Sequence, residues 1–295
     1  MPELPEVESV RAQLAPVLVG RRLAQVEIAD PRLTRPLDPT EVARELEGEV
    51  VEAVDRRGKY LIVRFESGRA LLIHLRMTGS LRHARAGTLP DDPHQRAVVR
   101  LDDGSDVAYR DVRRFGTWLV LEPADVPAYV DARVGDEPLD HNFRPRDLGR
   151  RLANRRAPVK AALLDQRTVA GIGNIYADEA LWRARVHPLR RAGDLTSEEV
   201  RALHRGVRRA LEVGIARQGS TLTDYRLPDG SSGRMQTEFK VYGRAGEPCP
   251  RCGTPVEKIR VAGRGTWYCP HCQPPPQAAS SSSSRPSRSS RQSSV

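Results

Sequence analysis

Residues 60–75 read Tyr60-Leu-Ile-Val-Arg-Phe-Glu-Ser-Gly-Arg-Ala-Leu-Leu-Ile-His-Leu75 and contain two short runs of β-branched, aliphatic and aromatic residues. Each run has the length of a strand and is shorter than a stable helix. The Ser67-Gly68 pair between them is a turn signal typical of a β-hairpin. The stretch therefore predicts two antiparallel strands that turn at Gly68.

Short β-rich runs separated by turn residues continue on both sides of this hairpin. Asp103-Gly104 marks a second turn, and further β-rich runs are found at 23–28, 49–54, 97–101, 107–109 and 117–121. Before them, apolar residues from Val7 to Leu18 repeat with the spacing of one helical face, and Pro5 suits the first helical turn. Residues 1–132 therefore predict a β-sandwich with a leading helix.

The rest of the chain turns helical and ends in a cysteine cluster. Residues 133–150, with their Pro, Asp and Gly, are expected to form a linker. A helical domain is expected over 151–245, with helices at 159–164, 175–185 and 197–215 and a long polar loop at 217–238. Residues 246–273 hold all four cysteines, and residues 274–295, rich in Ser and Arg, are expected to be disordered. The predicted fold class is α+β.

Composition and charge favour a globular protein with an anionic partner. The formal net charge is +10, which attracts polyanions such as nucleic acid. The alternative is that a basic tail and a general preference for Arg over Lys raise this number without any partner. No run reaches the roughly 18 apolar residues of a membrane span, and the acidic N-terminus lacks the features of a signal peptide. We therefore expect a cytoplasmic protein with no membrane partner.

The four cysteines form two Cys-x-x-Cys pairs, Cys249/Cys252 and Cys269/Cys272. Two such pairs at this separation can supply four thiolates to one tetrahedral zinc ion. Disulfides are the alternative, which a cytosolic location disfavours. One structural Zn²⁺ is the expected cofactor, because four thiolates leave no open coordination position for a substrate.

The segment between the two pairs is basic and aromatic, and it predicts a β-hairpin with Arg264 between two glycines. One interpretation is a solvated surface hairpin held by zinc. The other is that Arg264 approaches a phosphate group, as basic ribbons that bind nucleic acid do.

The N-terminus also allows two interpretations. Removal of Met1 would expose the secondary amine of Pro2, and an α-amine is largely unprotonated near neutral pH, so it can attack an electrophilic sugar carbon. Glu3 and Glu6 lie close enough in sequence to exchange protons with it. Alternatively, these residues are an ordinary acidic start of a helix.

Six motifs, taken together, narrow these alternatives. In chain order they are Met-Pro-Glu-Leu-Pro-Glu-Val-Glu at 1–8, Arg57-Gly-Lys59-Tyr60, His74-Leu-Arg-Met77-Thr-Gly79, Arg113-Arg-Phe115-Gly116, Gly171-Ile-Gly-Asn174-Ile-Tyr176, and the four-cysteine finger. The set closely resembles the formamidopyrimidine-DNA glycosylase family, also called 8-oxoguanine-DNA glycosylase and AP lyase. The resemblance covers residue 1 to about residue 273.

This resemblance implies a β-sandwich followed by a helix–two-turn–helix domain and a zinc finger, with duplex DNA in the cleft between the domains. It implies that a monomer excises oxidised purines and then cleaves the strand by β,δ-elimination. Pro2 is similar to the family's nucleophile at C1′, and Glu3 to the acid that protonates the sugar ring oxygen. Glu6 is similar to a supporting proton-handling residue, and Lys59 and Arg264 to the family's cations at the lesion and its phosphate.

The resemblance also implies a DNA-binding set. A base that undergoes chemistry must leave the stack, and the vacated space has to be filled. Met77 and Phe115 resemble the residues that wedge into the stack, and Arg113 the one that pairs with the orphaned base. Lys160, Asn174 and Arg264 are expected to bind the phosphates that flank the lesion, and His94 completes the DNA-binding set. Without the resemblance, Met77 and Phe115 read as core residues.

One departure and two rival functions remain. Family members have Pro where this chain has Val112, which is expected to loosen the loop that carries Arg113 and Phe115. The endonuclease VIII branch uses the same proline on oxidised pyrimidines, but Leu4, Met77 and the long 217–238 loop favour the formamidopyrimidine branch. The other rival is a non-catalytic zinc-ribbon protein that only binds damaged DNA.

Overall fold

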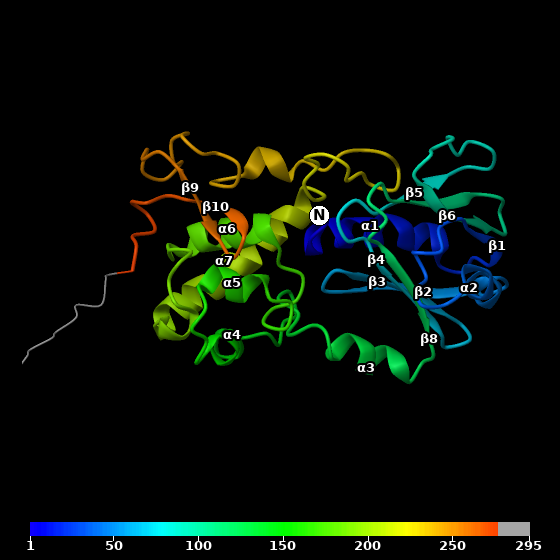
Figure 1. Ribbon diagram of the computed structural model, residues 1–295, viewed down its shortest axis with the longest axis horizontal. Coiled ribbons are helices and arrows are strands. Elements are labelled where there is room, and N and C mark those ends of the chain that lie inside the picture. The colour runs from blue at the N-terminus through cyan, green and yellow to red at the C-terminus, as the bar shows by residue number, and fades with distance from the viewer. Residues whose placement is uncertain (277–295) are drawn as a thin grey trace, which may run out of the picture.

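The hairpin at residues 60–75 forms as the sequence predicts. Strand β3 (Tyr60–Phe65) pairs antiparallel with β4 (Ala70–His74), and Gly68 takes a φ of +88° in the turn between them. The computed structural model describes residues 1–276, so most of the tail predicted at 274–295 lies outside the described residues. Figure 1 shows the sheets on one side of the molecule and the helices with the last hairpin on the other.

The N-terminal half is a sandwich of two antiparallel sheets. One sheet has the strand order β2-β3-β4-β8, and the other has the order β1-β6-β7-β5. The remaining strands of the two sheets are β1 (Leu23–Ile28), β2 (Val51–Arg57), β5 (Ser80–Ala84), β6 (Gln95–Leu101), β7 (Asp106–Arg110) and β8 (Thr117–Leu121). The chain changes sheets after β1, after β4 and after β7, and the last two connections cross the same end of the sandwich.

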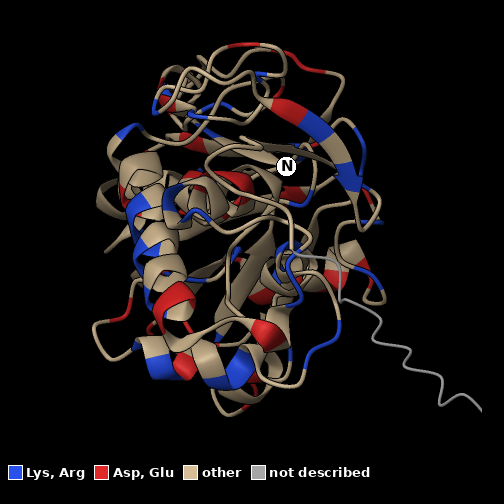
Figure 2. Ribbon diagram, turned by 90° about the vertical axis from the view of Figure 1, so that its left-hand side faces the viewer, with Lys and Arg blue, Asp and Glu red and all other residues tan. Residues whose placement is uncertain are grey.

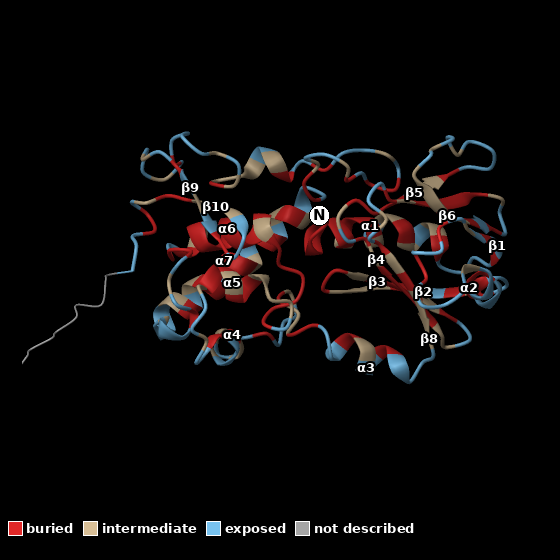
Figure 3. Ribbon diagram, viewed as in Figure 1, coloured by how far each residue is buried: buried red, intermediate tan, exposed pale blue. Residues whose placement is uncertain are grey.

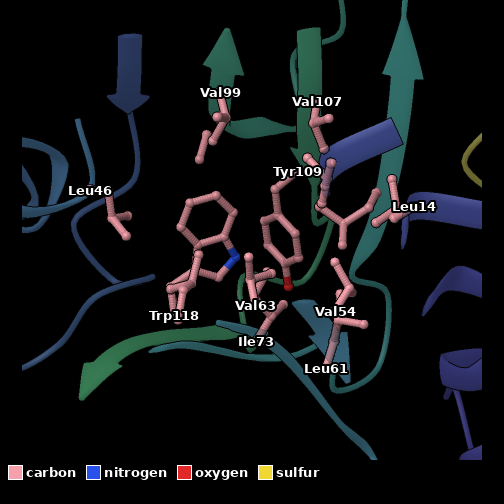
Figure 4. Close-up of a cluster of buried hydrophobic side chains, with 14 of the residues drawn as sticks. Leu14, Leu46, Val54, Leu61, Val63, Ile73, Val99, Val107, Tyr109 and Trp118 are labelled. Atoms are coloured by element: carbon pink, nitrogen blue, oxygen red, sulfur yellow. The ribbon is translucent and has the colours of Figure 1, made fainter. Parts of the chain in front are cut away.

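Two helices complete the core of this half. Helix α1 (Leu4–Leu18) packs beside β2 and β3, and α2 (Pro39–Leu46) lies against β1. Figure 4 shows Tyr109 and Trp118 standing side by side between the sheets, with Val63 and Ile73 from one sheet and Val99 and Val107 from the other. The core therefore draws on both sheets, and the predicted β-sandwich is confirmed.

Strands β3 and β4 are buried on both faces, which explains why their sequences are apolar without alternation. Their outer face is covered by α3 (Asp125–Asp131), whose Val126 and Val130 pack with Ile62 and Leu72. A strand buried on both faces reads as a continuous apolar run.

The C-terminal half is built on α6 (Asn174–Ala184) and α7 (Ser197–Ala216), which pack along each other. Helix α7 begins with a capping box in which the Thr196 hydroxyl accepts the N–H of Glu199 at 3.1 Å and the Glu199 carboxylate accepts that of Thr196 at 2.7 Å. The other elements of this half are α4 (Pro145–Leu152), α5 (Val159–Leu164), η1 (Ala192–Asp194), η2 (Met235–Glu238), β9 (Glu257–Val261) and β10 (Arg264–Tyr268). Figure 2, which faces this half, shows basic and acidic residues interleaved on its helices.

Among residues 1–276, one strand, three α-helices and two short 3₁₀ helices were not predicted. They are β5, α2, α3, α4, η1 and η2. The start of α2 does have a signal in the sequence, Asp38 before Pro39, and the Asp38 side chain accepts the N–H of Thr40 at 2.8 Å. The range 133–150, expected to be a linker, contains most of α4. Leu148 of that helix is fully buried against the core of the helical half, so the range ends inside that half. No helix among residues 1–276 is both long and apolar enough to span a membrane.

The place of α4 can be tested with Leu148→Ala. Removing a fully buried leucine leaves a cavity, so we expect the free energy of unfolding to fall by about 2–5 kcal/mol in a urea titration. Arg146→Ala, on the exposed side of the same helix, should change it by less than about 0.5 kcal/mol. Equal, small effects of both substitutions would mean that residues 145–152 behave as a linker.

Candidate active site and nucleic-acid interface

Glu3 stands at the start of α1, and its carboxylate caps a different helix, α6. Its Oε2 accepts the N–H of Gly173 at 2.7 Å, and its Oε1 accepts the N–H of Ile175 at 3.0 Å. The N–H of Tyr176 lies 3.4 Å from Oε2. A helix leaves its first amides unpaired and carries a partial positive charge there, so a carboxylate is stabilised in this position. Glu3 is 2% exposed, and its contacts join the two halves of the molecule in their interior.

Gly171 and Gly173, the two glycines before α6, are needed because the N-terminal segment passes too close to them to leave room for a side chain. Gly171 has a φ of +82° and its carbonyl accepts the N–H of Leu4 at 3.0 Å. A Cβ on Gly171 would lie 2.5 Å from the Cβ of Leu4, and a Cβ on Gly173 would lie 2.3 Å from Cδ of Glu3. The Gly-Ile-Gly motif therefore lets the N-terminal segment reach the end of α6.

Glu6, one turn further along α1, is a fully enclosed carboxyl group. Its Oε2 accepts the N–H of Glu3 at 2.9 Å, while its Oε1 accepts the hydroxyl of Tyr176 at 2.9 Å and the N–H of Ser220 at 2.7 Å. Burial and the neighbouring Glu3 carboxylate raise the pKa of Glu6 to about 7, against the opposing effect of these donors. A carboxyl group with this pKa can hold or release a proton at neutral pH.

Lys59 lies in the turn between β2 and β3 and is 5% exposed. Burial lowers the pKa of its ammonium, the charges of Glu3 and Glu6 raise it, and the charge of Arg264 lowers it. The turn is fixed from outside by Glu137, which accepts the N–H of Gly58 at 3.0 Å and pairs with Arg56 at 2.9 Å. The structure thus brings Lys59 to the two carboxylates, as the sequence motifs alone could not show.

Pro2 is buried, whereas Met1 is 44% exposed. Pro2 directly precedes Glu3, so its position is set by the contact of Glu3 with α6. Four of the five residues expected to take part in the reaction, namely Pro2, Glu3, Glu6 and Lys59, therefore meet where the sandwich joins the helical half.

Arg264, the remaining residue expected to take part in the reaction, is exposed at the start of β10. Lys160 and Asn174 hold its hairpin in place. The carbonyl oxygen of Gly265 accepts two hydrogen bonds of 3.1 Å, one from Nζ of Lys160 and one from Nδ2 of Asn174. Lys160 Nζ also donates to the Thr266 hydroxyl at 2.8 Å.

Lys160, for which a phosphate contact is predicted, has a partner inside the protein. Its side chain is fully buried, and Nζ lies 2.7 Å from Oδ1 of Asp178. A charge enclosed in this way needs a partner, and Asp178 supplies it. Lys160 therefore connects α5 and α6 to the hairpin next to Arg264. Asn174 also contacts the hairpin, and its Oδ1 has no partner among the described residues.

The four cysteines are gathered as a zinc site requires. Their Sγ atoms all lie within 4.8 Å of one another, against the sulfur–sulfur separation of about 3.8 Å that a tetrahedral site with Zn–S bonds of about 2.3 Å has. The indole Nε1 of Trp182, on α6, donates to Sγ of Cys249 at 3.3 Å, a kind of contact that orients and stabilises a thiolate ligand. The cluster fits one structural Zn²⁺, and the prediction of this cofactor is confirmed.

The residues expected to enter the DNA lie on neighbouring loops at one end of the sandwich. Met77 is in the connection from β4 to β5 and is half-buried, while Arg113 and Phe115 are in the connection from β7 to β8. Phe115 is 53% exposed, and the guanidinium of Arg113 lies 4.9 Å from the centroid of its ring. The carbonyl of His94 accepts the N–H of Asp111 at 3.0 Å at the base of the same loop. Phe115 is therefore not a core residue in this structure.

Comparison with known proteins accounts for this arrangement. Family models of the formamidopyrimidine-DNA glycosylase match the N-terminal domain over residues 1–118 and the H2TH domain over 134–226. A model of the zinc finger found in FPG and IleRS matches residues 246–275. The chain belongs to the formamidopyrimidine-DNA glycosylase family. It is a DNA glycosylase, and the predicted resemblance and fold class are confirmed.

Relatives and solved structures span nearly the whole chain. The formamidopyrimidine-DNA glycosylase of Symbiobacterium thermophilum is 49% identical and that of Roseiflexus is 47% identical, over 98% and 92% of this chain and 95% and 100% of those proteins. A complex of a Lactococcus lactis FPG mutant with Fapy-dG-containing DNA has a TM-score of 0.87 at 37% identity, covering 93% of this chain and 100% of that one. Wild-type Lactococcus lactis FPG (MutM) bound to DNA with an oxidised pyrimidine has a TM-score of 0.86 at 37% identity, with the same coverage.

Several residues of this glycosylase site were not among the predicted site residues. Tyr176, Asp178 and Ser220 contact Glu6 or the hairpin, and Glu137 fixes the turn of Lys59. Tyr176 ends the Gly-Ile-Gly-Asn-Ile-Tyr motif, in which it was given no role, and Glu137 lies in the range expected to be a linker. Their partners are distant in the sequence, so no local pattern could indicate them.

The raised pKa of Glu6 predicts how the stability of this glycosylase depends on pH. Between pH 4.5 and about 7 the folded protein binds more protons than the unfolded chain, so the free energy of unfolding should fall as the pH rises, by up to roughly 3 kcal/mol. Glu6→Gln should reduce this slope in urea titrations at several pH values and leave the part that Asp178 contributes, because burial raises the pKa of Asp178 to about 7 as well. Glu198→Gln, at an exposed position on α7, should keep it. A slope unchanged by Glu6→Gln would contradict the near-neutral pKa.

Removal of zinc should act through the hairpin. Chelation is expected to release β9 and β10 from Lys160 and Asn174 and to weaken binding to abasic-site DNA by roughly 10- to 100-fold, as for the loss of a charged hydrogen bond. Fluorescence anisotropy with metal-free and zinc-restored protein measures this change. Arg264→Ala should weaken binding similarly while the protein retains one zinc per chain. Metal-free protein with unaltered affinity would contradict the role of the hairpin.

Proposed function

We propose that this glycosylase excises oxidised purines from duplex DNA with Pro2 as nucleophile and then cleaves the strand by β,δ-elimination. The observation that carries the proposal is the enclosed cluster of Pro2, Glu3, Glu6 and Lys59 where the two halves of the molecule meet. Such a cluster places a nucleophile next to two proton-handling groups and a cation.

The first step is attack of the Pro2 nitrogen on C1′ of the damaged nucleotide. Met1 must be removed first, because only then does Pro2 carry an amine and not an amide. As the N–C1′ bond forms, the C1′–O4′ bond breaks and the sugar ring opens, and the nitrogen, now positively charged, gives up its proton. Glu3, the next residue, is placed to carry this proton to the ring oxygen.

The damaged base then leaves C1′ with its bonding electrons, and the lone pair of the Pro2 nitrogen forms the C1′=N double bond of an iminium ion. This ion acidifies the C2′ proton. Loss of this proton expels the 3′ phosphate, and a second elimination expels the 5′ phosphate. Glu6, whose pKa is about 7, contacts Glu3 directly and can exchange a proton with the site at neutral pH. Lys59 and Arg264 supply positive charge beside the carboxylates, where a phosphate of the lesion would lie.

The proposed partner is damaged double-stranded DNA, bound by a monomer. Met77 and Phe115 would fill the space left by the flipped nucleotide, and Arg113 would pair with the orphaned base, which offsets a stacking loss of a few kcal/mol. Arg264 and His94 would contact phosphates. The exposure of Phe115 on a loop supports this assignment, since a large apolar side chain in water is available for insertion.

A second candidate substrate is an oxidised pyrimidine. One structural neighbour, wild-type Lactococcus lactis FPG, was solved with DNA containing an oxidised pyrimidine. The loop at 217–238 favours purines, because it is long enough to cap a flipped purine. It crosses from α7 to the sandwich. Tyr225 and Leu227 pack into the sandwich core, and the N–H of Ser220 binds Glu6, so the loop lies over the site.

Borohydride trapping tests the nucleophile. Protein lacking Met1 should form a covalent adduct at Pro2 with a duplex that carries 8-oxoguanine opposite cytosine, and peptide mass mapping locates it. Pro2→Gly should lose excision while still binding abasic-site DNA, because the substitution replaces the secondary amine of the ring with a primary amine and leaves the DNA-binding residues in place. Unchanged excision by Pro2→Gly would exclude Pro2 as the nucleophile.

Two other outcomes would redirect the proposal. Trapping on an oxidised pyrimidine but not on 8-oxoguanine would give this chain the substrate preference of the endonuclease VIII branch. Trapping on neither, with Met1 shown to be absent, would favour a protein that binds damaged DNA without cleaving it.

A further inference from the structure

The two loops that carry Met77, Arg113 and Phe115 run side by side because of the strand order. His74, the last residue of β4, is paired with Thr117, the first residue of β8. Ser80, the first residue of β5, is paired with Arg110, the last residue of β7. The connections 75–79 and 111–116 are therefore held between the same two pairs of strand ends, one on each sheet.

A single buried carboxylate, that of Asp111, bonds to both connections. Its Oδ1 accepts the hydroxyl of Thr78, next to Met77, and the N–H of Arg113 at 3.2 Å. Its Oδ2 accepts the N–H of Gly116 at 2.8 Å. Thr78 also accepts the N–H of Arg113 at 3.0 Å. Asp111 is 1% exposed, so these donors replace the water that a free carboxylate would bind.

Tyr109 supports the same two connections from the core. A Cβ on Gly79 would lie 2.4 Å from the Tyr109 hydroxyl, and a Cβ on Gly116 would lie 1.7 Å from it. Figure 4 shows the Tyr109 ring standing beside Trp118, and the ring centroids are 5.7 Å apart. Both loops thus close onto one rigid side chain of the sandwich core.

In the conformation of the 111–116 loop, the side chains of Arg113 and Phe115 are exposed. Arg114, between them, has a φ of +59° and pairs with Asp30 through two hydrogen bonds of 2.6 and 2.7 Å. Arg114 is thereby turned toward the protein. Val112, which was expected to loosen the loop, is exposed, and the bonds of Asp111 and Arg114 fix the loop on either side of it.

From these contacts we propose that Asp111 and Thr78 are positioning residues that make Met77, Arg113 and Phe115 enter the duplex as one unit. The proposal rests on the proposed function, in which these three side chains fill the space of the flipped nucleotide. Asp111 and Thr78 do not touch the reacting atoms. They fix the spacing between the Met77 wedge and the Arg113/Phe115 pair, and a small error in that spacing is costly for insertion into stacked bases.

Asp111→Asn tests the unit, because an amide nitrogen cannot accept the hydrogen bonds that the second carboxylate oxygen accepts. Under single-turnover conditions, excision of 8-oxoguanine opposite cytosine should slow about tenfold or more, as for the loss of a hydrogen bond to a charged group. Cleavage at a preformed abasic site, which has no base to extrude, should change by less than about twofold. A 2-aminopurine beside the lesion should report slower insertion by its fluorescence.

The controls separate a positioning role from a merely structural one. Thr78→Val should reproduce the excision defect, and Thr78→Ser, which keeps the hydroxyl, should restore excision. Asp55→Asn on β2, which affects a half-exposed ion pair with Arg64 on β3, should leave both reactions unchanged. Circular dichroism and the melting temperature verify that each variant is folded.

Equal slowing of excision and of abasic-site cleavage would overturn the proposal, as would wild-type kinetics for both Asp111→Asn and Thr78→Val. If wild-type protein itself excises no 8-oxoguanine but cleaves abasic sites, the proposed substrate is wrong, and the inference about Asp111 and Thr78 still stands. The wedge is then measured on the lesion that wild-type protein does excise.

Discussion

The contact on which the rest of the structure depends is the Glu3 carboxylate at the N-terminus of α6. It joins the first residues of the sandwich to a helix that begins 170 residues later, and it satisfies amides that the helix would otherwise leave unpaired in the interior. Because Pro2 precedes Glu3 directly, the same contact fixes the proposed nucleophile. Two glycines make the approach possible, since a side chain on either would overlap Leu4 or Glu3. Catalytic geometry and the junction of the two halves therefore have one physical origin.

Helix α6 connects the Glu3 contact to the zinc hairpin. Figure 3 shows that this helix is buried along most of its length. Its first turn receives Glu3, its middle carries Asp178, which binds Lys160 and the N–H of Trp267, and its last turn carries Trp182, which binds the Cys249 sulfur. One rigid helix thus places Arg264 of the zinc hairpin in relation to Glu3 and Lys59. Zinc stabilises a hairpin too small to have a core of its own, and α6 gives that hairpin its orientation.

The two halves are also bridged outside α6, by Glu137 at the turn of Lys59 and by the 217–238 loop, whose Tyr225 and Leu227 pack into the sandwich core. These segments read as a linker and a polar loop because their composition is that of surface chain. Composition reports exposure and local conformation, but it does not report which distant residue a side chain meets. The same limit applies to Lys160, whose partner inside the protein no sequence pattern indicates. A lysine is read as a surface cation until the structure places a buried Asp178 beside it.

What the sequence determined by itself is the set of features with a short period or a fixed local spacing. The hairpin at 60–75, the leading helix, the capped α7 and the two Cys-x-x-Cys pairs are all of this kind, because their backbone conformation and chemistry depend on neighbours a few residues away. The six motifs in order indicated the family and the identity of the site residues. The tertiary structure alone decided how these pieces meet: Glu3 with α6, Glu6 with Ser220, and Thr78 with Asp111. Such contacts join residues from 33 to 214 positions apart, and their energies depend on burial and on shared space, which exist only once the chain has folded.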